Sequence, residues 1–597
     1  MLKLAISDNI KIMKAFILKQ INLLIVILLA LVFFGMTASF NYFSQEKDYV
    51  KWSSPDETAN YFYTKKFSET GELAFFDPVS VIGDNLIMPR SMRSDFGWIK
   101  PVSFLGIIFV YGKIAAVFGT AVIPFLTPFF AALGIIIFYL IVRSLFNERI
   151  GLWSAAILTV FPVYIYYTVR SMFHNILFLV FLLFGLYFVI LALGEKREKI
   201  KNKFLSLSFS HPRVEYFTSF FSGLFFGLAI ITRTSELLWL LPVFFCAWCF
   251  YARRFGFLKL LIFAAGIIIP LLPAAYYNQV LYGSFFYGGY NAMNKSLDEI
   301  VKTGGEMLKS TWAGQFEYYR SYLAQIFRNI FYFGFNSGQS ILMFSRYVIG
   351  MFPAIFYGGL AGLVILIVEN CRHFRKKYLV YLSIVLVFSF FLVFYYGSWK
   401  FNDNPDLTRF TIGNSYTRYW LPIYLALMPL ASLALVRFSR AIFLVNYKIS
   451  SRIRNLLATG FQIIVIAVFA FSSIFFVLYG SEEGLIYLYH NNRAEKENTE
   501  KVWSLTEPEA IIITRYYDKF FFPERRVIMG TLPNDEILTA TVQLVKYYPV
   551  YYYNFYLNEA DVEYLNSRKL SPYNLKMELV QKTNAKFGLY RIESSRE

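Results

Sequence analysis

Residues 21–61 have the sequence INLLIVILLALVFFGMTASFNYFSQEKDYVKWSSPDETANY, which joins an apolar run to a polar segment with two adjacent carboxylates. Residues 21–38 are apolar almost throughout and approach the roughly 20 residues that a helix needs to cross a bilayer. Because this run exceeds the roughly 7 to 15 residues of a signal-peptide core, we interpret it as a retained membrane anchor rather than a cleaved signal. The carboxylates of Asp56 and Glu57 then lie just beyond the membrane surface.

The composition of the whole chain indicates a membrane protein with many spans. Its 597 residues are 57% hydrophobic and 16% charged, and the mean hydropathy is +0.47. From the lengths of the apolar runs we predict an α-helical polytopic fold with about eleven spans. The predicted spans are residues 19–40, 121–142, 151–167, 175–194, 218–233, 236–251, 258–276, 347–368, 378–397, 419–436 and 456–479.

The net charge of +19 follows the predicted topology. Basic residues cluster after every second span, as the positive-inside rule expects of cytoplasmic loops, so we expect no nucleic-acid partner. This pattern places the N-terminus inside and the C-terminus outside. Residues 102–118 are apolar enough to insert, but a span there would invert every later loop, so we place them along the outer interface or in a re-entrant helix. The basic clusters lie at residues 143–149, 196–213, 253–259, 372–377 and 437–454.

The predicted topology divides the chain into two parts. Residues 1–479 form a transmembrane domain with external loops at residues 41–120 and 277–346. Residues 480–597 form an external tail in which short apolar runs alternate with helical segments, as is typical of a small α/β domain. The expected strands are residues 510–514, 526–529 and 550–553, and the expected helices are residues 534–547 and 559–568.

Several segments, taken in order, resemble one family of membrane enzymes. They are Pro55–Tyr61 with its acidic pair, Trp98–Pro101, Val169–Asn175, Gly223–Arg233, Tyr277–Ser284 and Arg418–Pro422. This set is similar to the polyprenyl-phosphate-dependent GT-C glycosyltransferases, which include protein O-mannosyltransferases and the aminoarabinose transferase of lipid A. The resemblance covers about residues 15–435. The family often has an aspartate where this chain has Asn175, and this departure puts a two-carboxylate site in doubt.

The resemblance implies the transfer of a sugar from a lipid-linked donor on the external side of the membrane. Such a transfer needs a base for the acceptor proton and cations for the phosphate leaving group. Asp56 would be the base, and Glu57 would orient it, a substrate hydroxyl or a metal. The simpler alternative is that both acids only stabilise the positive end of the helix that follows.

Four cations at predicted external helix ends are candidates for binding the donor phosphate: Lys100, Arg170, Arg233 and Arg418. Arginine can bind phosphate bidentately. Ordinary membrane roles are the alternatives, since Arg233 can pair with Glu236 three residues later and the others can anchor or snorkel at the interface. Further candidates for substrate contact are His174, Asn175, Tyr282 and Tyr290.

We therefore expect an inverting glycosyltransferase of the plasma membrane, or of the endoplasmic reticulum membrane if the source is eukaryotic. Its partners would be a polyprenyl-phosphate-linked sugar donor, the lipid bilayer, and a protein, lipid or glycan acceptor. The sequence demands no cofactor, and the superfamily allows a divalent metal. A flippase for lipid-linked sugars and a non-catalytic scaffold are the alternatives. A transporter would predict repeated halves with broken helices, and the sequence has no such repeat.

Overall fold

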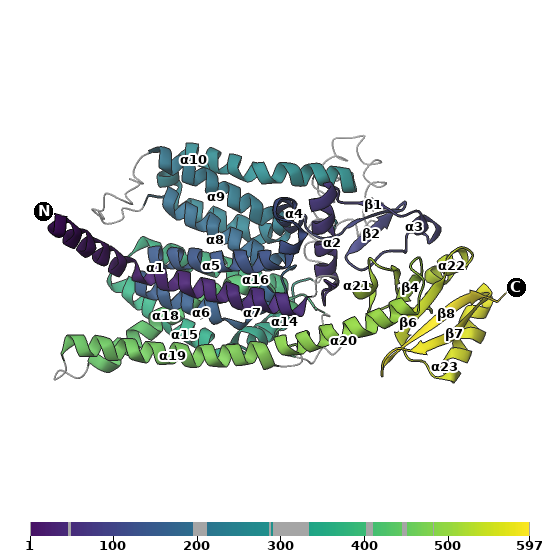
Figure 1. Cartoon of the computed structure of the whole chain (residues 1–597). Coiled ribbons are helices and arrows are strands. Elements are labelled where there is room, and N and C mark those ends of the chain that lie inside the picture. Colours follow the sequence, from purple (N-terminus) through teal and green to yellow (C-terminus); the bar gives the residue numbers. More distant parts are fainter. Residues whose placement is uncertain are drawn as a thin grey trace.

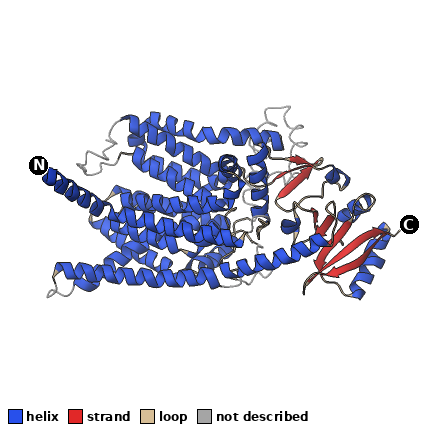
Figure 2. Cartoon of the chain, in the orientation of Figure 1, coloured by secondary structure: helices blue, strands red, loops and turns tan. Residues whose placement is uncertain are grey.

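The computed structural model describes residues 2–45, 49–194, 212–283, 285, 288–289, 334–401, 410–444, 450–480 and 483–595. Long helices run side by side in a bundle, and a mixed sheet lies beyond one end of it (Figures 1 and 2). In this described part of the chain, nine helices are long and apolar enough to cross a membrane. They lie in α1 (Leu2–Ser44), α5 (Ile123–Leu145), α8 (His174–Ala192), α9 (Pro212–Thr232), α10 (Leu237–Tyr282), α15 (Pro353–Arg372), α16 (Lys376–Gly397), α18 (Leu421–Leu444) and α19 (Ser451–Tyr479).

Two breaks reconcile this count with the eleven spans that the sequence predicts. Helices α6 (Glu148–Val160) and α7 (Pro162–Val169) are bent by 52° and together are long enough for one span. Helix α10 reverses direction at Gly256, where φ is +72° and ψ is 165°. The rings of Phe244 and Phe263 lie 6.0 Å apart, whereas a continuous helix would separate these residues by about 28 Å. The chain therefore folds back, and α10 comprises two spans.

The turn at Gly256 and the turn between α15 and α16, which carry two of the basic clusters, lie at the end of the bundle where the N-terminus lies (Figure 1). Arg254 Nη2 donates to the Gly194 carbonyl at 2.6 Å, and Lys376 Nζ donates to the Phe250 carbonyl at 2.5 Å. These contacts join loops that the sequence assigns to one side of the membrane. That this end faces the cytoplasm stays a prediction from the charge pattern.

Short elements cover the opposite end of the bundle. They are α2 (Pro55–Thr70), α3 (Pro78–Ile82), α4 (Gly106–Phe118), α14 (Ser337–Phe344), α17 (Ser415–Tyr419) and the strands β1 (Phe75–Phe76), β2 (Met92–Asp95) and β3 (Trp98–Pro101). The strands pair antiparallel in the order β1-β3-β2. Helices α2 and α4 lie across the direction of the long helices (Figure 1).

The 13 residues of α4 are too few to cross a bilayer, which takes about 20. The helix instead packs against α2, with the rings of Phe67 and Phe109 5.5 Å apart. That residues 102–118 lie along the outer interface or form a re-entrant helix stays a prediction. Helix α14 begins at Ser337, within the loop that the sequence assigns to residues 277–346.

The C-terminal part of the chain forms a five-stranded sheet with helices around it. Strands β4 (Ile511–Thr514), β5 (Arg526–Met529) and β6 (Val550–Phe555) are parallel, and β8 (Phe587–Ser594) is antiparallel to both β6 and β7 (Leu575–Lys582), in the order β5-β4-β6-β8-β7. The helices are α20 (Leu485–Ser504), α21 (Asp518–Phe521), α22 (Asp535–Leu544) and α23 (Glu559–Tyr564). The three predicted strands and both predicted helices are present. The sequence analysis missed the hairpin of β7 and β8.

Candidate active site

The acidic pair occupies the first turn of α2, directly after Pro55. The preceding residue, Ser54, is extended and makes no side-chain capping bond. Asp56 and Glu57 both direct their hydrogen bonds to other segments of the chain, as the contacts below show. Acids in a first turn still favour the helix electrostatically. Their side chains nevertheless take part in tertiary structure.

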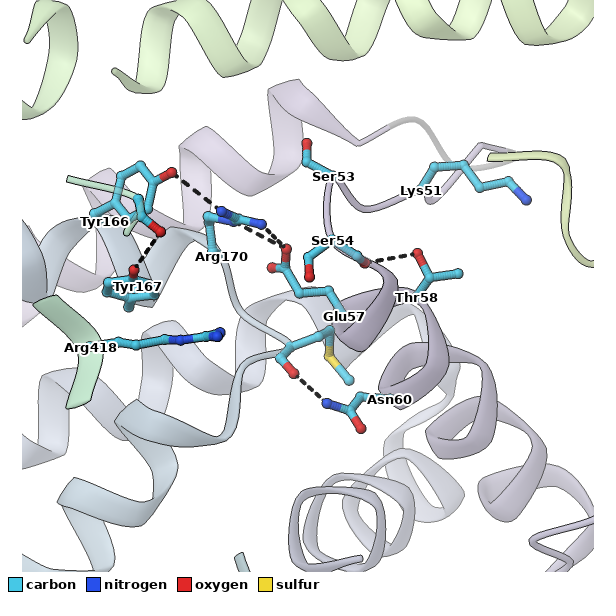
Figure 3. Close-up of polar contacts among 12 residues, drawn as sticks. Lys51, Ser53, Ser54, Glu57, Thr58, Asn60, Tyr166, Tyr167, Arg170 and Arg418 are labelled. Atoms are coloured by element: carbon cyan, nitrogen blue, oxygen red, sulfur yellow. Dashed lines mark hydrogen bonds and ion pairs between the residues drawn. The ribbon is translucent and has the colours of Figure 1, made fainter. Parts of the chain in front are cut away.

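Glu57 forms a buried ion pair with Arg170, which ends α7 (Figure 3). Its side chain is 1% exposed, and Oε2 accepts from Arg170 Nη2 at 2.7 Å and from Nε at 3.1 Å. Arg170 Nη1 also donates to the hydroxyl of Tyr166 at 3.3 Å. Burial raises the pKa of the Glu57 carboxyl, and the charges of Arg170 and Arg418 act in the opposite direction. The other carboxylate oxygen, Oε1, has no hydrogen-bond partner among the described residues.

Asp56 is only partly buried and accepts a hydrogen bond from the hydroxyl of Ser91 at 2.5 Å. Ser91 has φ = +63°, a left-handed conformation that residues other than glycine adopt rarely. The bond uses Oδ1, and within the described residues Oδ2 makes no hydrogen bond. Sequence reasoning missed Ser91, because nothing in the local pattern signals a serine with positive φ.

Three of the four predicted phosphate-binding cations lie along one row of aromatic rings. The guanidinium groups of Arg170 and Arg418 lie 4.7 and 4.4 Å from the centre of the Phe173 ring. Arg418 and Arg233 in turn lie 5.1 and 4.6 Å from the centre of the Tyr419 ring. The row therefore runs Arg170, Phe173, Arg418, Tyr419, Arg233, and we call it the arginine row. Each contact is a cation–π interaction, for which Arg is well suited.

The members of the row come from three separate segments of the chain. Figure 3 shows Arg170 and Arg418 extending toward Glu57 from different elements. Arg418 also donates to Ser415 Oγ at 2.8 Å, and its carbonyl accepts from Asn175 Nδ2 at 3.3 Å. The position where the family often has an aspartate thus anchors the helix that carries Arg418.

Arg233 makes the ion pair that the sequence offered as its alternative role. Its Nε donates to Glu236 Oε1 at 2.8 Å, and its Nη2 donates to the Tyr396 hydroxyl at 3.2 Å. The Arg233 side chain is buried, so these contacts hold it in place. Its role toward a phosphate stays a prediction.

Lys100 lies in a second cluster with Asp95 and Tyr282. Its ammonium group is 2.6 Å from Asp95 Oδ2 and from the Leu281 carbonyl, and 5.2 Å from the centre of the Tyr282 ring. Partial burial raises the pKa of Asp95, but hydrogen bonds from Lys100 and Arg93 outweigh this effect and lower it overall. Sequence reasoning named Lys100 and Tyr282 but missed Asp95, the last residue of β2, whose carboxylate binds the lysine.

Two predicted contact residues remain, His174 and Tyr290, and the structure describes only His174. His174 Nε2 is 3.1 Å from Ser103 Oγ and 3.1 Å from the Phe104 carbonyl, so the ring binds the segment just before α4. Tyr290 lies outside the described residues. In the part of the chain that the structure describes, no group of three or more His, Cys, Asp or Glu side chains could hold a metal ion. The divalent metal that the superfamily allows stays an untested expectation.

The chain matches no family model and no curated protein. Among solved structures it is similar to ArnT from Cupriavidus metallidurans bound to undecaprenyl phosphate, with 13% identity and a TM-score of 0.51, over 94% of this chain and 97% of that chain. The apo form of the same protein gives a TM-score of 0.50 at 13% identity, over the same shares of both chains. The oligosaccharyltransferase of Archaeoglobus fulgidus gives 0.49 at 12% identity, over 88% of this chain and 69% of that chain. This chain therefore has the fold of the GT-C membrane glycosyltransferase ArnT, which confirms the fold that the resemblance implied.

Proposed function

We propose that the protein is an integral membrane glycosyltransferase that moves a sugar from a polyprenyl-phosphate donor to an acceptor on the extracytoplasmic side. The observation that carries the proposal is the meeting of the acidic pair with the arginine row at one end of the bundle. The fold supports it, because the similar ArnT structure contains undecaprenyl phosphate. A lipid phosphate and a base are the two groups that this reaction must bring together.

Asp56 is the proposed general base. Among the described residues its Oδ2 makes no hydrogen bond and could accept one from an acceptor hydroxyl, while Ser91 holds Oδ1. Asp56 takes the proton as the acceptor oxygen attacks the anomeric carbon of the sugar. The bond from that carbon to the phosphate oxygen breaks, and its electron pair leaves with the polyprenyl phosphate. Because the attack comes from the side opposite the leaving group, the configuration inverts.

The arginine row is the proposed binding site for the donor phosphate. Guanidinium groups bind phosphate oxygens bidentately, and they stabilise the negative charge that grows on the leaving group. Arg418 lies at the centre of the row, between Arg170 and Arg233. Lys100, with Asp95 as its partner, is the proposed fourth cation at the edge of the site.

We assign Glu57 to the orientation of Arg170 and not to proton transfer. Its Oε2 accepts two hydrogen bonds from this one guanidinium, which fixes the plane of the group. A buried carboxylate that is committed to an arginine is a poor proton acceptor for a substrate. This division of roles leaves Asp56 as the single base. It is consistent with Asn175, which replaces the second carboxylate that the family often has.

The test is a transfer assay on the purified full-length protein with a panel of radiolabelled polyprenyl-phosphate sugars. Wild type is compared with Asp56→Asn and with the matched control Glu69→Gln, which changes an exposed acid of the same helix. We expect wild type and the control to release polyprenyl phosphate and Asp56→Asn to lose most of this activity. Equal release by all three would show that the base lies elsewhere.

The same assay separates the two alternatives. Movement of labelled lipid across a vesicle membrane without release of polyprenyl phosphate would favour a flippase. Binding of the lipid without movement or release would favour a scaffold. Either result would overturn the proposed transferase.

A further inference from the structure

A salt bridge joins the C-terminal domain to the first external loop. The backbone N–H of Arg90 donates to Asp518 Oδ2 at 2.8 Å, and the guanidinium donates to Oδ1 through Nη2 at 2.7 Å and through Nε at 3.1 Å. The two residues are 428 positions apart, and Asp518 is fully buried. Such a charge-assisted bidentate contact fixes both the position and the orientation of Arg90.

The next residue along the chain is Ser91, whose hydroxyl binds Asp56. Its backbone is held in the left-handed region, and its carbonyl accepts from the Val102 N–H at 3.2 Å. A non-glycine residue stays in this conformation only when its surroundings enforce it, at a cost of about 1 kcal/mol or more. The bonds of Arg90 to Asp518 hold the backbone before Ser91, and the Val102 N–H holds the Ser91 carbonyl.

The C-terminal sheet also packs directly on the same loop. Ile87 and Met88 form bridges with Ile528 of β5, and Ile87 is 2% exposed. A second ion pair, between Arg526 Nε and Asp77 Oδ2 at 2.9 Å, crosses the same interface and does not involve the segment next to Ser91. The loop that contacts Asp56 is therefore braced by a domain that is far away in sequence.

We infer that the C-terminal domain is part of the catalytic apparatus, because Asp518, through Arg90 and Ser91, positions the carboxylate of Asp56. Arg90, Ser91 and Asp518 are positioning residues and touch no substrate. The inference rests on the proposed function, in which Asp56 is the base.

The arginine row makes the inference specific. Arg170, Arg233 and Arg418 come from other segments of the chain. We therefore expect the proposed phosphate site to stay intact when the contacts of Arg90 and Ser91 are disturbed. Loss of the Arg90 and Ser91 contacts should therefore lower turnover and leave the affinity for the lipid phosphate unchanged. A general loss of folding would lower both.

Two variants of the full-length protein and one control test the inference. Arg90→Gln removes the guanidinium and its ion pair with Asp518, while the backbone N–H bond to Oδ2 remains. Ser91→Gly removes the hydroxyl at a position where glycine adopts the required φ without strain, so the fold is preserved. Arg526→Gln removes the second ion pair of the same interface and is the control.

Three quantities are measured for each protein. They are kcat with the donor that wild type turns over, the dissociation constant for undecaprenyl phosphate in nanodiscs, and the amide hydrogen exchange of residues 89–102. We expect kcat to fall on the order of tenfold or more in Arg90→Gln and Ser91→Gly, with the dissociation constant unchanged. Exchange rises in Arg90→Gln and stays at the wild-type level in Arg526→Gln.

The results separate this inference from the proposed function. If both variants keep the kcat of the control, the positioning role is wrong even though transfer is real. If wild type transfers nothing, the proposed function is wrong. Amide hydrogen exchange then tests the link from Asp518 through Arg90 to Ser91 without the transfer assay. Unchanged exchange of residues 89–102 in Arg90→Gln would overturn that link as well.

Discussion

Arg170 and Arg418 lie on the same aromatic ring, with their guanidinium groups 4.7 and 4.4 Å from the centre of Phe173. Like charges placed together in a partly buried site cost free energy unless negative charge offsets them. Glu57 contributes one buried carboxylate to this site. An anionic ligand such as a lipid phosphate would add further negative charge at the same place, which is why we place the donor there.

Arg418 is expected to contribute more to donor binding than Arg233. Arg418→Met should weaken the binding of undecaprenyl phosphate roughly tenfold or more, since hydrogen bonds to charged groups contribute about 1.5–3 kcal/mol. Arg233 is committed to Glu236 and Tyr396, so Arg233→Met should mainly lower the thermal midpoint. Binding isotherms and thermal unfolding in nanodiscs measure the two effects.

The control for this pair is Arg437→Met, which changes an arginine near the opposite end of the bundle whose partner is Glu369. Its binding should equal that of wild type. Equal weakening by all three variants would mean that the effect comes from net charge and not from the arginine row.

The ion pair of Glu57 and Arg170 is expected to show strong coupling. Arg170→Met leaves a buried carboxylate without its partner and should cost about 3 kcal/mol of stability. Glu57→Gln should cost less, because Arg170 keeps its contact with the Tyr166 hydroxyl. The double variant should be at least about 1 kcal/mol more stable than the sum of the single changes predicts. Additive losses in denaturant or thermal unfolding would contradict the pairing.

Lys519, in α21, should make stability depend on pH above neutrality. Burial lowers its pKa from 10.5 to about 8, and the charge of Arg90 acts in the same direction, while Asp518 opposes it. Between these two values the unfolded chain binds more protons than the folded chain, so stability rises with pH over that window. Below about pH 8 the folded protein carries a charged lysine at a cost.

Replacing this lysine should therefore remove the dependence. We expect Lys519→Met to be more stable than wild type at neutral pH, with the difference closing toward about pH 10.5. Thermal midpoints measured across this range test the sign. Lys546→Met, which changes a lysine in the turn after α22 with an exposed hydrogen bond, is the control and should show no such convergence. A gap that stays constant with pH would refute the assignment.

Gly413 is expected to tolerate a side chain poorly, because the buried Tyr166 has less freedom to move than the Glu483 carboxylate. A Cβ atom there would lie 2.1 Å from Glu483 Oε2 and 2.8 Å from the hydroxyl of Tyr166, which is fully buried and contacts Arg170. Gly413→Ala should destabilise the protein by about 1–3 kcal/mol and lower transfer, because the tyrosine must move.

Gly460→Ala is the matched control for Gly413→Ala. Gly460 lies within α19, where a Cβ would meet nothing within 4 Å. Alanine is a better helix former than glycine, so this variant should gain roughly 0.5–1 kcal/mol. Thermal unfolding and the transfer assay distinguish the two substitutions. A loss of stability in both would point to a general sensitivity of the bundle.

The membrane spans could be predicted because their cause is local. Inside a bilayer each helix satisfies its own backbone hydrogen bonds and needs an apolar run of sufficient length. The two apolar runs of α10 fit this rule, and the reversal at Gly256 separates them as the sequence predicts. The β7–β8 hairpin was missed because β7 has only two buried residues, Leu575 and Met577, and so has little apolar pattern.

The site was only partly predictable. The order of the motifs pointed to Asp56, Glu57, Arg170, Arg233 and Arg418, and one ion pair and the arginine row connect these segments. Their roles toward substrate stay predictions. No local sequence pattern predicted three contacts: Ser91 with Asp56, Asp95 with Lys100, and Asp518 with Arg90.

The sequence by itself determined which segments are long and apolar enough to cross a membrane and which loops carry positive charge, because length and charge act on each segment separately. Only the tertiary structure decided which charges meet. Glu57 pairs with a residue 113 positions away, and Asp518 pairs with one 428 positions away. Such contacts depend on how the helices and the C-terminal sheet pack, and packing is a property of the whole chain rather than of any single segment.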